Sequence, residues 1–523
     1  MKKILSLLII VSLVYSCGTA QNATLNMDKP TVFADPVIYA NSITLDELKK
    51  DLYIYASDEF EGRETGEEGQ KKAVEFLKSQ YIEMGINSPL GEDDYFQEVL
   101  LEVAKSPNAS IMINNQSFDH ISDFISFSSN ASQEFSADEI LYLGYGIDDE
   151  AYSDYKDQDI KDKMILIRAG EPKNEDGTYV ISGTSQPSDW SGRRQEYRVK
   201  AEAAKNNGAK VLFFYNPDLF PMMSQRYESI EKSGGTGRMA LKGNSDDMFV
   251  FLIGDTMKNV ILPNLANEKK PTSLNLDFKL NYKSLSEQIE SENVLAFIKG
   301  SEKPDEIIVI SAHLDHEGKK GEDIYNGADD DGSGTVAILE IAEAFKLAVD
   351  AGQRPKRSVL FLHVTGEEKG LLGSRYYTDM DPVFPLENTV ANLNIDMIGR
   401  IDPKREGSNR NYLYIIGSDK LSSELHQISE EVNSKYCNIE FDYTFNDEND
   451  PNRFYYRSDH YNFAKNNIPV IFYFSGTHAD YHKPTDTPDK IDYDLLENRT
   501  RLVFYTAWEL ANREDRIQVD KLN

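Results

Sequence analysis

The sequence predicts an α/β protein with a mixed, largely parallel sheet that is flanked by helices. From Asn293 on, apolar runs of strand length alternate with stretches of helical periodicity. The apolar runs are nearly continuous, as in strands that are buried on both faces of a sheet. The 523 residues, of which 40% are hydrophobic, provide core material for about two to four domains.

The first half of the chain begins with two predicted helices, at residues 45–56 and 68–84. Gly85 follows the second helix, at the position where a left-handed glycine ends many helices. From about residue 106 to residue 282 short β-like runs, such as 140–143 and 164–167, alternate with polar loops. A helix at 198–206 then leads into a strand at 209–215. This stretch contains few candidate catalytic residues.

The second half supplies the sheet. We expect strands at 294–298, 307–310, 359–364, 390–395, 412–416 and 469–474, and helices at 335–347, 371–377, 421–435 and 495–511. Ligands of open α/β sheets bind at the carboxyl ends of the strands. Polar residues directly after these strands are therefore the candidates for a functional site.

Two of these positions suggest a metal. His313 follows the strand at 307–310, and Asp315 comes two residues later, so the imidazole can bind an ion while the carboxylate orients it. Asp329, Asp330 and Asp331 precede the helix at 335–347. Helix capping explains one acid, but three adjacent carboxylates repel one another, and a cation would relieve this repulsion.

Three further strand ends complete the set. Glu367 and Glu368 follow the strand at 359–364, so one carboxylate can hold a metal while its neighbour acts as a general base. Asp396 follows the strand at 390–395, and His482 follows the strand at 469–474. Imidazole and carboxylate donors without thiolate suit Zn²⁺, with Mn²⁺ and Co²⁺ as less common choices. One tetrahedral zinc needs only four ligands, so these histidines and carboxylates are more than one ion requires. Their number fits two ions that share a carboxylate.

These residues lie in five motifs, which occur in the order SAHLDHEG, NGADDDGSGTVAILE, VTGEEKGLLGS, NIDMIGR and DYHKPTDTPDKI. The series resembles the di-zinc exopeptidases of metallopeptidase family 28, which include bacterial aminopeptidases and glutamate carboxypeptidase II. The resemblance covers about residues 45–100 and 293–511. It implies the zinc-exopeptidase, phosphorylase/hydrolase-like fold and two Zn²⁺ per chain.

The resemblance also implies a role for each site residue. His313 and Asp396 would bind one zinc, Glu368 and His482 the other, and Asp330 would bridge them. Glu367 would be the general base, Asp315 would orient His313, and Tyr481 would polarise the substrate carbonyl.

The middle of the chain has a resemblance of its own. The run AEAAKNNGAKVLFFYN is similar to a protease-associated domain, a β-rich module often inserted into this family's catalytic domain. We therefore expect a lipoprotein signal peptide and lipobox at 1–17, a tether at 18–40, a di-zinc peptidase domain at 41–105 and 283–515, and an inserted protease-associated domain at 106–282.

The N-terminus has the pattern of a targeting segment. Lys2 and Lys3 precede an apolar run at 4–14 that is too short to span a bilayer. The run leads into Val-Tyr-Ser-Cys-Gly, which resembles a bacterial lipobox with Cys17 as the lipidated residue. This predicts export and lipid anchoring to the bacterial envelope, with the lipid as the one membrane contact. Plain secretion is the alternative.

The charge and the cysteine count of the chain limit the kinds of partner and metal site that it can have. There are 56 basic and 88 acidic residues, and the net charge of −32 repels nucleic acids. Apart from Cys17, the only cysteine is Cys437, which excludes an internal disulfide and a four-cysteine zinc site. We expect peptide substrates and no nucleic-acid partner.

The expected function is an exported zinc-dependent exopeptidase, an aminopeptidase that removes N-terminal residues by means of a water activated between two zinc ions. The alternatives are a glutamate-carboxypeptidase-like or dipeptidase activity, a single-zinc glutaminyl cyclase relative, and a non-catalytic module like the transferrin receptor. The full set of ligands argues against the last two. Ser458, Asp459 and His460 could suggest a serine site, but no Gly-x-Ser-x-Gly motif occurs, and we expect them to line the pocket wall. The remaining histidines are expected to have structural or supporting roles: His120, His316, His363, His426, His478.

Overall fold

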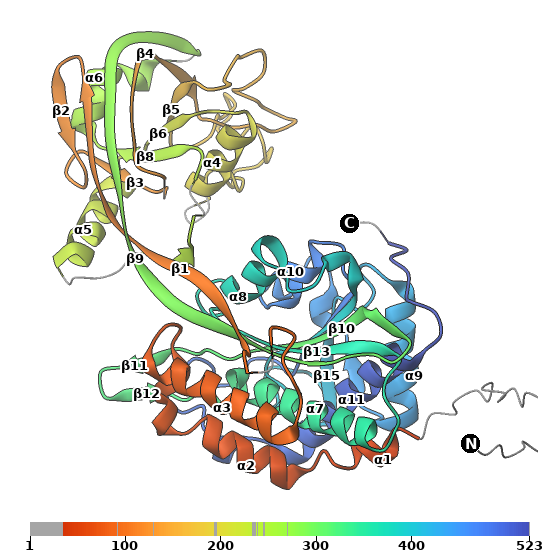
Figure 1. Cartoon of the computed structure of the whole chain (residues 1–523). Helices are drawn as coiled ribbons and strands as arrows, with labels where there is room; N and C mark the ends of the chain where they lie inside the picture. Colours follow the sequence, from red (N-terminus) through yellow and green to blue (C-terminus); the bar gives the residue numbers. More distant parts are fainter. Residues whose placement is uncertain are drawn as a thin grey trace, which may run out of the picture.

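The computed structural model describes residues 35–521 apart from 92, 129, 193–195, 233–236, 238, 244–245 and 269. The predicted signal peptide and lipobox, and the tether up to residue 34, lie outside these residues. The described chain forms two bodies joined by two long strands, β1 (Phe96–Ile113) and β9 (Thr272–Ile298) (Figure 1).

The larger body contains the mixed, largely parallel sheet that the sequence predicts. β10 (Lys303–His313) pairs in parallel with β13 (Arg357–Val364) and with β14 (Thr389–Ile395), and β14 pairs in parallel with β17 (Val470–Phe474). The end of β9 runs antiparallel to β13. At the other edge β15 (Tyr412–Ile416) runs antiparallel to β17 and parallel to β16 (Glu440–Asp442). The carboxyl ends of the four central strands therefore meet at one edge of the sheet.

Helices cover both faces of this sheet (Figure 1). One face packs against α1 (Val37–Ala40), α2 (Leu45–Tyr55), α3 (Glu68–Met84), α7 (Gly334–Asp350), α9 (Ser423–Tyr436) and α11 (Tyr493–Asn512). The other face packs against α8 (Leu372–Arg375) and α10 (His460–Ala464). In β10, Ile308 and Ile310 belong to the first core, whereas Ile307 and Val309 belong to the second. Burial on both faces explains the unbroken apolar run.

The smaller body is β-rich, as expected for residues 106–282. It contains β2 (Gln116–Asp119), β3 (Phe124–Ser126), β4 (Gln133–Gly144), β5 (Met164–Arg168), β6 (Val211–Tyr215), β8 (Phe249–Ile253), α4 (Glu196–Asn206), α5 (Leu219–Lys232) and α6 (Asp255–Ile261). β7 (Met239–Leu241) instead pairs with β1 and packs against Leu372 and Tyr376 of the larger body. The smaller body has apolar clusters of its own, one around Phe213 and Phe251 and another around Leu212 and Leu252.

The connection between the bodies is a two-stranded ribbon. β1 and β9 pair antiparallel from Phe96 opposite Val294 to Ile113 opposite Phe278, with a register shift between Lys105 and Asn108. The domain boundaries expected after residues 105 and 282 lie inside this ladder, next to the shift. The sequence predicts only 294–298 of β9, because the rest of the strand alternates polar and apolar residues in a solvent-facing ribbon.

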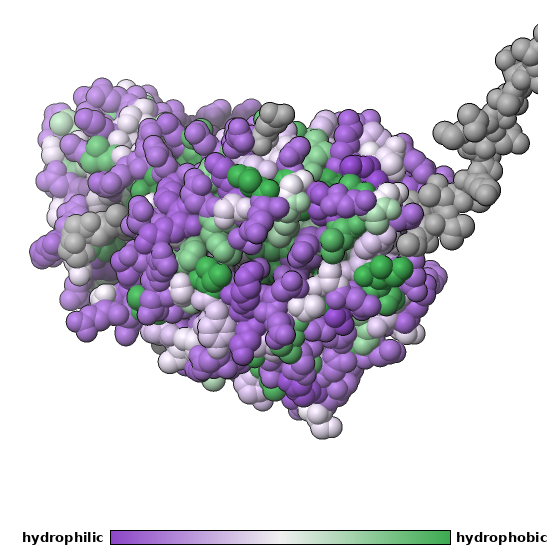
Figure 2. Space-filling view, turned by 60° about the horizontal axis from the view of Figure 1, so that its bottom comes forward, coloured by the Kyte–Doolittle hydropathy of each residue, from purple (hydrophilic) through white to green (hydrophobic). Residues whose placement is uncertain are grey.

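Local expectations hold elsewhere. The helix predicted at 68–84 is α3, and Gly85 ends it with a φ of 69°. Within the described ranges no helix is long and apolar enough to cross a bilayer. Hydrophilic residues cover most of the face in Figure 2, and hydrophobic residues appear there in small groups.

Candidate metal centre

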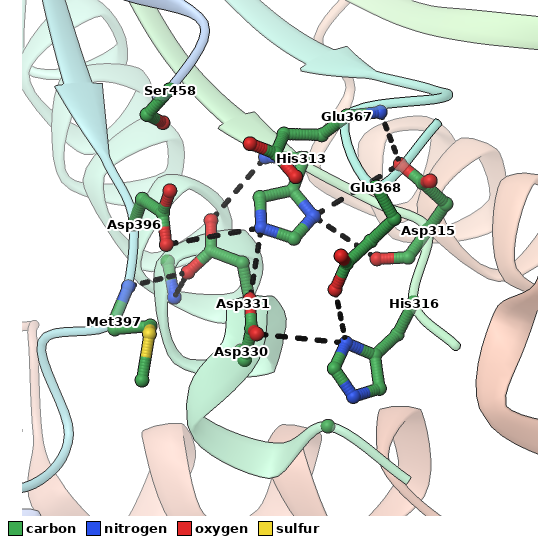
Figure 3. A network of polar contacts seen from close by, with 12 residues as sticks. His313, Asp315, His316, Asp330, Asp331, Glu367, Glu368, Asp396, Met397 and Ser458 are labelled. Atoms are coloured by element: carbon green, nitrogen blue, oxygen red, sulfur yellow. Dashed lines mark hydrogen bonds and ion pairs between the residues drawn. The ribbon is translucent and has the colours of Figure 1, made fainter. Parts of the chain in front are cut away.

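The site lies where the central strands end. β10 ends at His313, which is opposite Val364 at the end of β13, and Glu367 and Glu368 follow in the next loop. Asp396 comes directly after β14. Figure 3 shows these side chains pointing toward one another around Asp330. The parallel register thus brings together residues that are far apart in the sequence.

Asp330 is the shared member of two donor groups. Its Oδ1 lies 3.1 Å from Nε2 of His313, and its Oδ2 lies 3.1 Å from Nε2 of His482. Asp396 Oδ1 completes the first group, 3.8 Å from His313 Nε2. Glu368 Oε1 completes the second, 3.2 Å from His482 Nε2. The five residues expected to bind metal are therefore in one cluster, with one carboxylate oxygen of Asp330 facing each side.

The two neighbours of Asp330 bind the protein backbone instead. Asp331 Oδ1 accepts hydrogen bonds from the backbone N–H groups of Gly334 and Met397, both at 3.0 Å. Asp329 Oδ1 accepts the N–H of Gly399 at 2.6 Å. These acids fix the loop after β14 against the start of α7. Asp330 is therefore the acid of the three whose two carboxylate oxygens both face the donor groups.

Asp315 holds the turn that carries Glu367. Its Oδ1 accepts the backbone N–H of Glu367 at 3.1 Å, and its Oδ2 accepts the hydroxyl of Thr65 at 2.8 Å. Nδ1 of His313 lies 3.0 Å from the main-chain oxygen of Asp315 but 3.9 Å from its carboxylate. The contact that orients His313 thus runs through the backbone, while the carboxylate positions Glu367.

The donor atoms fit a bound cation. His313 Nε2, Asp330 Oδ2 and Glu368 Oε1 are buried and have no hydrogen-bond partner among the described residues, which is costly unless another charge satisfies them. Burial alone would lower the pKa of His482, but Asp330 and Glu368 raise it to about 10. The site therefore favours positive charge at this position, and its nitrogen and oxygen donors are those of zinc.

Glu367 lies beside the cluster but differs from Glu368. Burial raises the pKa of its carboxyl group well above the usual range; His313 opposes this shift, while Glu368 and Asp396 add to it. Glu368 is also buried, which would raise its pKa, but the nearby imidazoles of His316 and His482 lower the pKa of its carboxyl group to about 2. Of two adjacent carboxylates, one is thus kept as an anion and the other has the high proton affinity of a general base.

His316 was expected to be an ordinary histidine, and the structure corrects this. The side chain is fully buried, and Nδ1 lies 2.9 Å from Glu368 Oε1 (Figure 3). The sequence carries a signal for it, because His316 follows Asp315 within the motif of His313. His478 lies behind the cluster, with Nε2 3.3 Å from Asp329 Oδ2.

A cavity opens next to the donor groups. Tyr481 lines it, and the Tyr481 ring stacks on that of His482 with centroids 3.9 Å apart. The other lining residues are partly acidic, partly apolar: Asp330, Glu367, Asp396, Met397, Phe454, Arg457, Phe472, Phe474, Thr477, His482. Ser458 does not form a serine site here, since its hydroxyl accepts a hydrogen bond from Asn394 at 2.9 Å. A substrate group in the cavity would contact Glu367 and Tyr481 together.

The protein is thus an α/β protein in which two groups of possible metal donors, sharing Asp330, lie at the carboxyl ends of the central strands. Residues 293–507 match the family described as Peptidase family M28, and the chain therefore carries a peptidase family M28 domain.

Curated relatives match over short stretches. The mouse (Mus musculus) protein named Aminopeptidase NAALADL1 is 35% identical over 108 residues, which are 20% of this chain and 14% of that protein. The Probable glutamate carboxypeptidase AMP1 of Arabidopsis thaliana is 34% identical over 104 residues, which are 20% of this chain and 14% of that protein. A Probable zinc metalloprotease of Pyricularia oryzae is 34% identical over 121 residues, 22% of each. The chain thus spans less than a quarter of these relatives.

Solved structures align over more of the chain. The alignment with the aminopeptidase from Aneurinibacillus sp. strain AM-1 covers 94% of this chain and 99% of that chain, with 18% identity and a TM-score of 0.48. The zinc aminopeptidase BSAP of Bacillus subtilis covers 91% and 98%, with 18% identity and a TM-score of 0.45.

Proposed function

We propose that the protein is a zinc-dependent exopeptidase that acts as an aminopeptidase. The observation that carries the proposal is the position of Asp330, whose two oxygens each face a different histidine at 3.1 Å. Such a shared carboxylate suits two metal ions, one held by His313, Asp330 and Asp396 and the other by Asp330, Glu368 and His482.

When bound, the two ions would lower the pKa of a water molecule and polarise the scissile carbonyl. Glu367 would take the proton of the attacking water and pass it to the leaving amine. Asp315 supports this role because its carboxylate accepts the N–H of Glu367. The Tyr481 hydroxyl would donate a hydrogen bond to the carbonyl oxygen as negative charge develops there; burial, with nearby carboxylates, raises its pKa and so keeps it protonated.

The acidic wall of the cavity supports a substrate with a free ammonium group. Glu367 and Asp396 line the cavity beside apolar side chains such as Phe472 and Phe474. A peptide N-terminus carries its positive charge next to an apolar side chain, which matches this pairing.

The substrate class is tested with aminoacyl-p-nitroanilides beside peptides whose N-terminus is blocked. Hydrolysis of the former and not of the latter is the expected result. Cleavage of the blocked peptides alone would overturn the aminopeptidase assignment while leaving the zinc centre intact.

A carboxypeptidase-like or dipeptidase activity is the second candidate, and Arg457 favours it. Arg457 lines the same cavity and is exposed, with its guanidinium carbon 4.8 Å from the ring centre of Phe454. No Asp or Glu of the described residues pairs with it. An unpaired cation beside the reacting centre can hold the carboxylate of a short peptide.

Export and anchoring are proposed from the sequence. Cys17 would carry the lipid that holds the protein at the bacterial envelope, and residues 106–282 would form an inserted protease-associated domain. Labelling with a radioactive fatty acid tests the anchor. Label on the wild-type protein and none on Cys17→Ala is expected, and equal label on both would contradict it.

A further inference from the structure

His316 is the group in the centre to which no role has been given so far. Its side chain is fully buried, and neither ring nitrogen has a hydrogen-bond partner among the described residues. A histidine buried for structural reasons alone normally satisfies at least one nitrogen. His363 is such a case, since its Nε2 lies 2.8 Å from the hydroxyl of Tyr81.

The ring of His316 is directed at two particular oxygens. Nδ1 lies 2.9 Å from Glu368 Oε1 and 3.8 Å from Asp330 Oδ2. His482 Nε2 faces the same two atoms, at 3.2 Å and 3.1 Å. His316, Asp330 and Glu368 thus form a group of three possible metal donors, and His482 faces two atoms of that group.

These spacings suit one ion. Two donors at zinc-ligand distances of about 2.1 Å in a tetrahedron are roughly 3.4 Å apart. The four nitrogen–oxygen distances lie on either side of that value, between 2.9 Å and 3.8 Å. The two oxygens and Nδ1 of His316 are all buried without a hydrogen-bond partner in the described chain, so an ion among them would satisfy three groups that lack a hydrogen bond.

The backbone leaves room for this ring only because residue 327 is a glycine. A Cβ at Gly327 would lie 2.5 Å from Cγ of His316, and the residue has a φ of 52°. The ring is therefore fixed in place by the loop that leads into Asp330.

We propose that His316 is a protein ligand of the second ion, in addition to Asp330, Glu368 and His482; this rests on the proposed zinc centre. The second ion then has one protein ligand more than the first, which has three. The two ions should therefore differ in affinity, with the second held more tightly.

Paramagnetic NMR of the full chain loaded with Co²⁺ and labelled with ¹⁵N-histidine tests the proposal. Three strongly shifted imidazoles, from His313, His316 and His482, are expected. Two shifted imidazoles in a protein that binds two Co²⁺ would overturn the role of His316. A protein that binds no Co²⁺ or Zn²⁺ would instead refute the proposed zinc centre, so the two failures are distinguishable.

Variants give a second readout. In His316→Ala, zinc binding by calorimetry should show one site weakened at least about 100-fold, with the other unchanged. His363→Gln, which also removes a buried imidazole, is the matched control and should bind both ions normally. Equal zinc affinities in His316→Ala and wild type would contradict the proposal.

Discussion

Replacing Arg457 by Gln should separate the two substrate classes. The change removes a positive charge from the cavity and leaves the metal donors untouched, because no metal donor is hydrogen-bonded to Arg457 in the described chain. Gln keeps most of the aliphatic stem that covers Phe454.

The size of the effect follows from exposure. A carboxylate about 4 Å from the guanidinium gains roughly 1 kcal/mol in water and about 4 kcal/mol at an effective dielectric constant near 20. Arg457 is exposed, so about 1–2 kcal/mol is expected. This corresponds to a loss of about 5- to 30-fold in kcat/KM for substrates whose carboxylate reaches Arg457.

The assay compares dipeptides with the same dipeptides as C-terminal amides. Arg457→Gln should lower kcat/KM for the free dipeptides alone. Arg453→Gln is the matched control, because Arg453 is an exposed arginine of the same segment that stacks on Tyr456 and does not line the cavity. Equal losses for the acids and the amides would refute a carboxylate-binding role.

Three further outcomes are expected. Chelation should lower the melting temperature, and added Zn²⁺ should restore it, since one buried carboxylate oxygen each of Asp330 and Glu368 otherwise lacks a hydrogen bond. An unchanged melting temperature would contradict a bound ion. Burial, with Glu47 and Glu343 nearby, raises the pKa of Glu340 from 4.5 to about 9. Between these two pH values Glu340 keeps its proton in the folded state and loses it in the unfolded state. The free energy of unfolding therefore falls as the pH rises from 4.5 to about 9. Glu340→Gln should therefore stabilise the protein by up to about 3 kcal/mol at pH 7 and hardly at pH 5, and equal gains in thermal unfolding at both pH values would be inconsistent with this. Asp315→Ala should lower kcat about 10- to 100-fold with little change in zinc content, whereas loss of zinc would assign it to metal binding instead.

Local patterns in the sequence were sufficient for most of the larger body. The helix at 68–84 and the capping Gly85 could be predicted because helical periodicity and a glycine cap are local signals. The strand ends at His313, Glu368 and Asp396 could be predicted because doubly buried parallel strands are continuous apolar runs.

Other features depend on contacts between distant parts of the chain. The long ladder of β1 and β9 joins residues 165 to 198 positions apart, and nothing local in either strand specifies its partner. His316 faces Glu368 only because β10 and β13 lie side by side. The role of the Asp315 carboxylate was likewise hidden, since its partners are Thr65 and the backbone of Glu367.

The most direct test of the account is the hydrolysis of an aminoacyl-p-nitroanilide by wild type and Glu367→Gln, with zinc measured in both. The account predicts two zinc ions per chain in each protein and a kcat about 10²- to 10⁴-fold lower in the variant, the usual cost of losing a general base. Near wild-type hydrolysis by Glu367→Gln, or fewer than one zinc ion per wild-type chain, would contradict it.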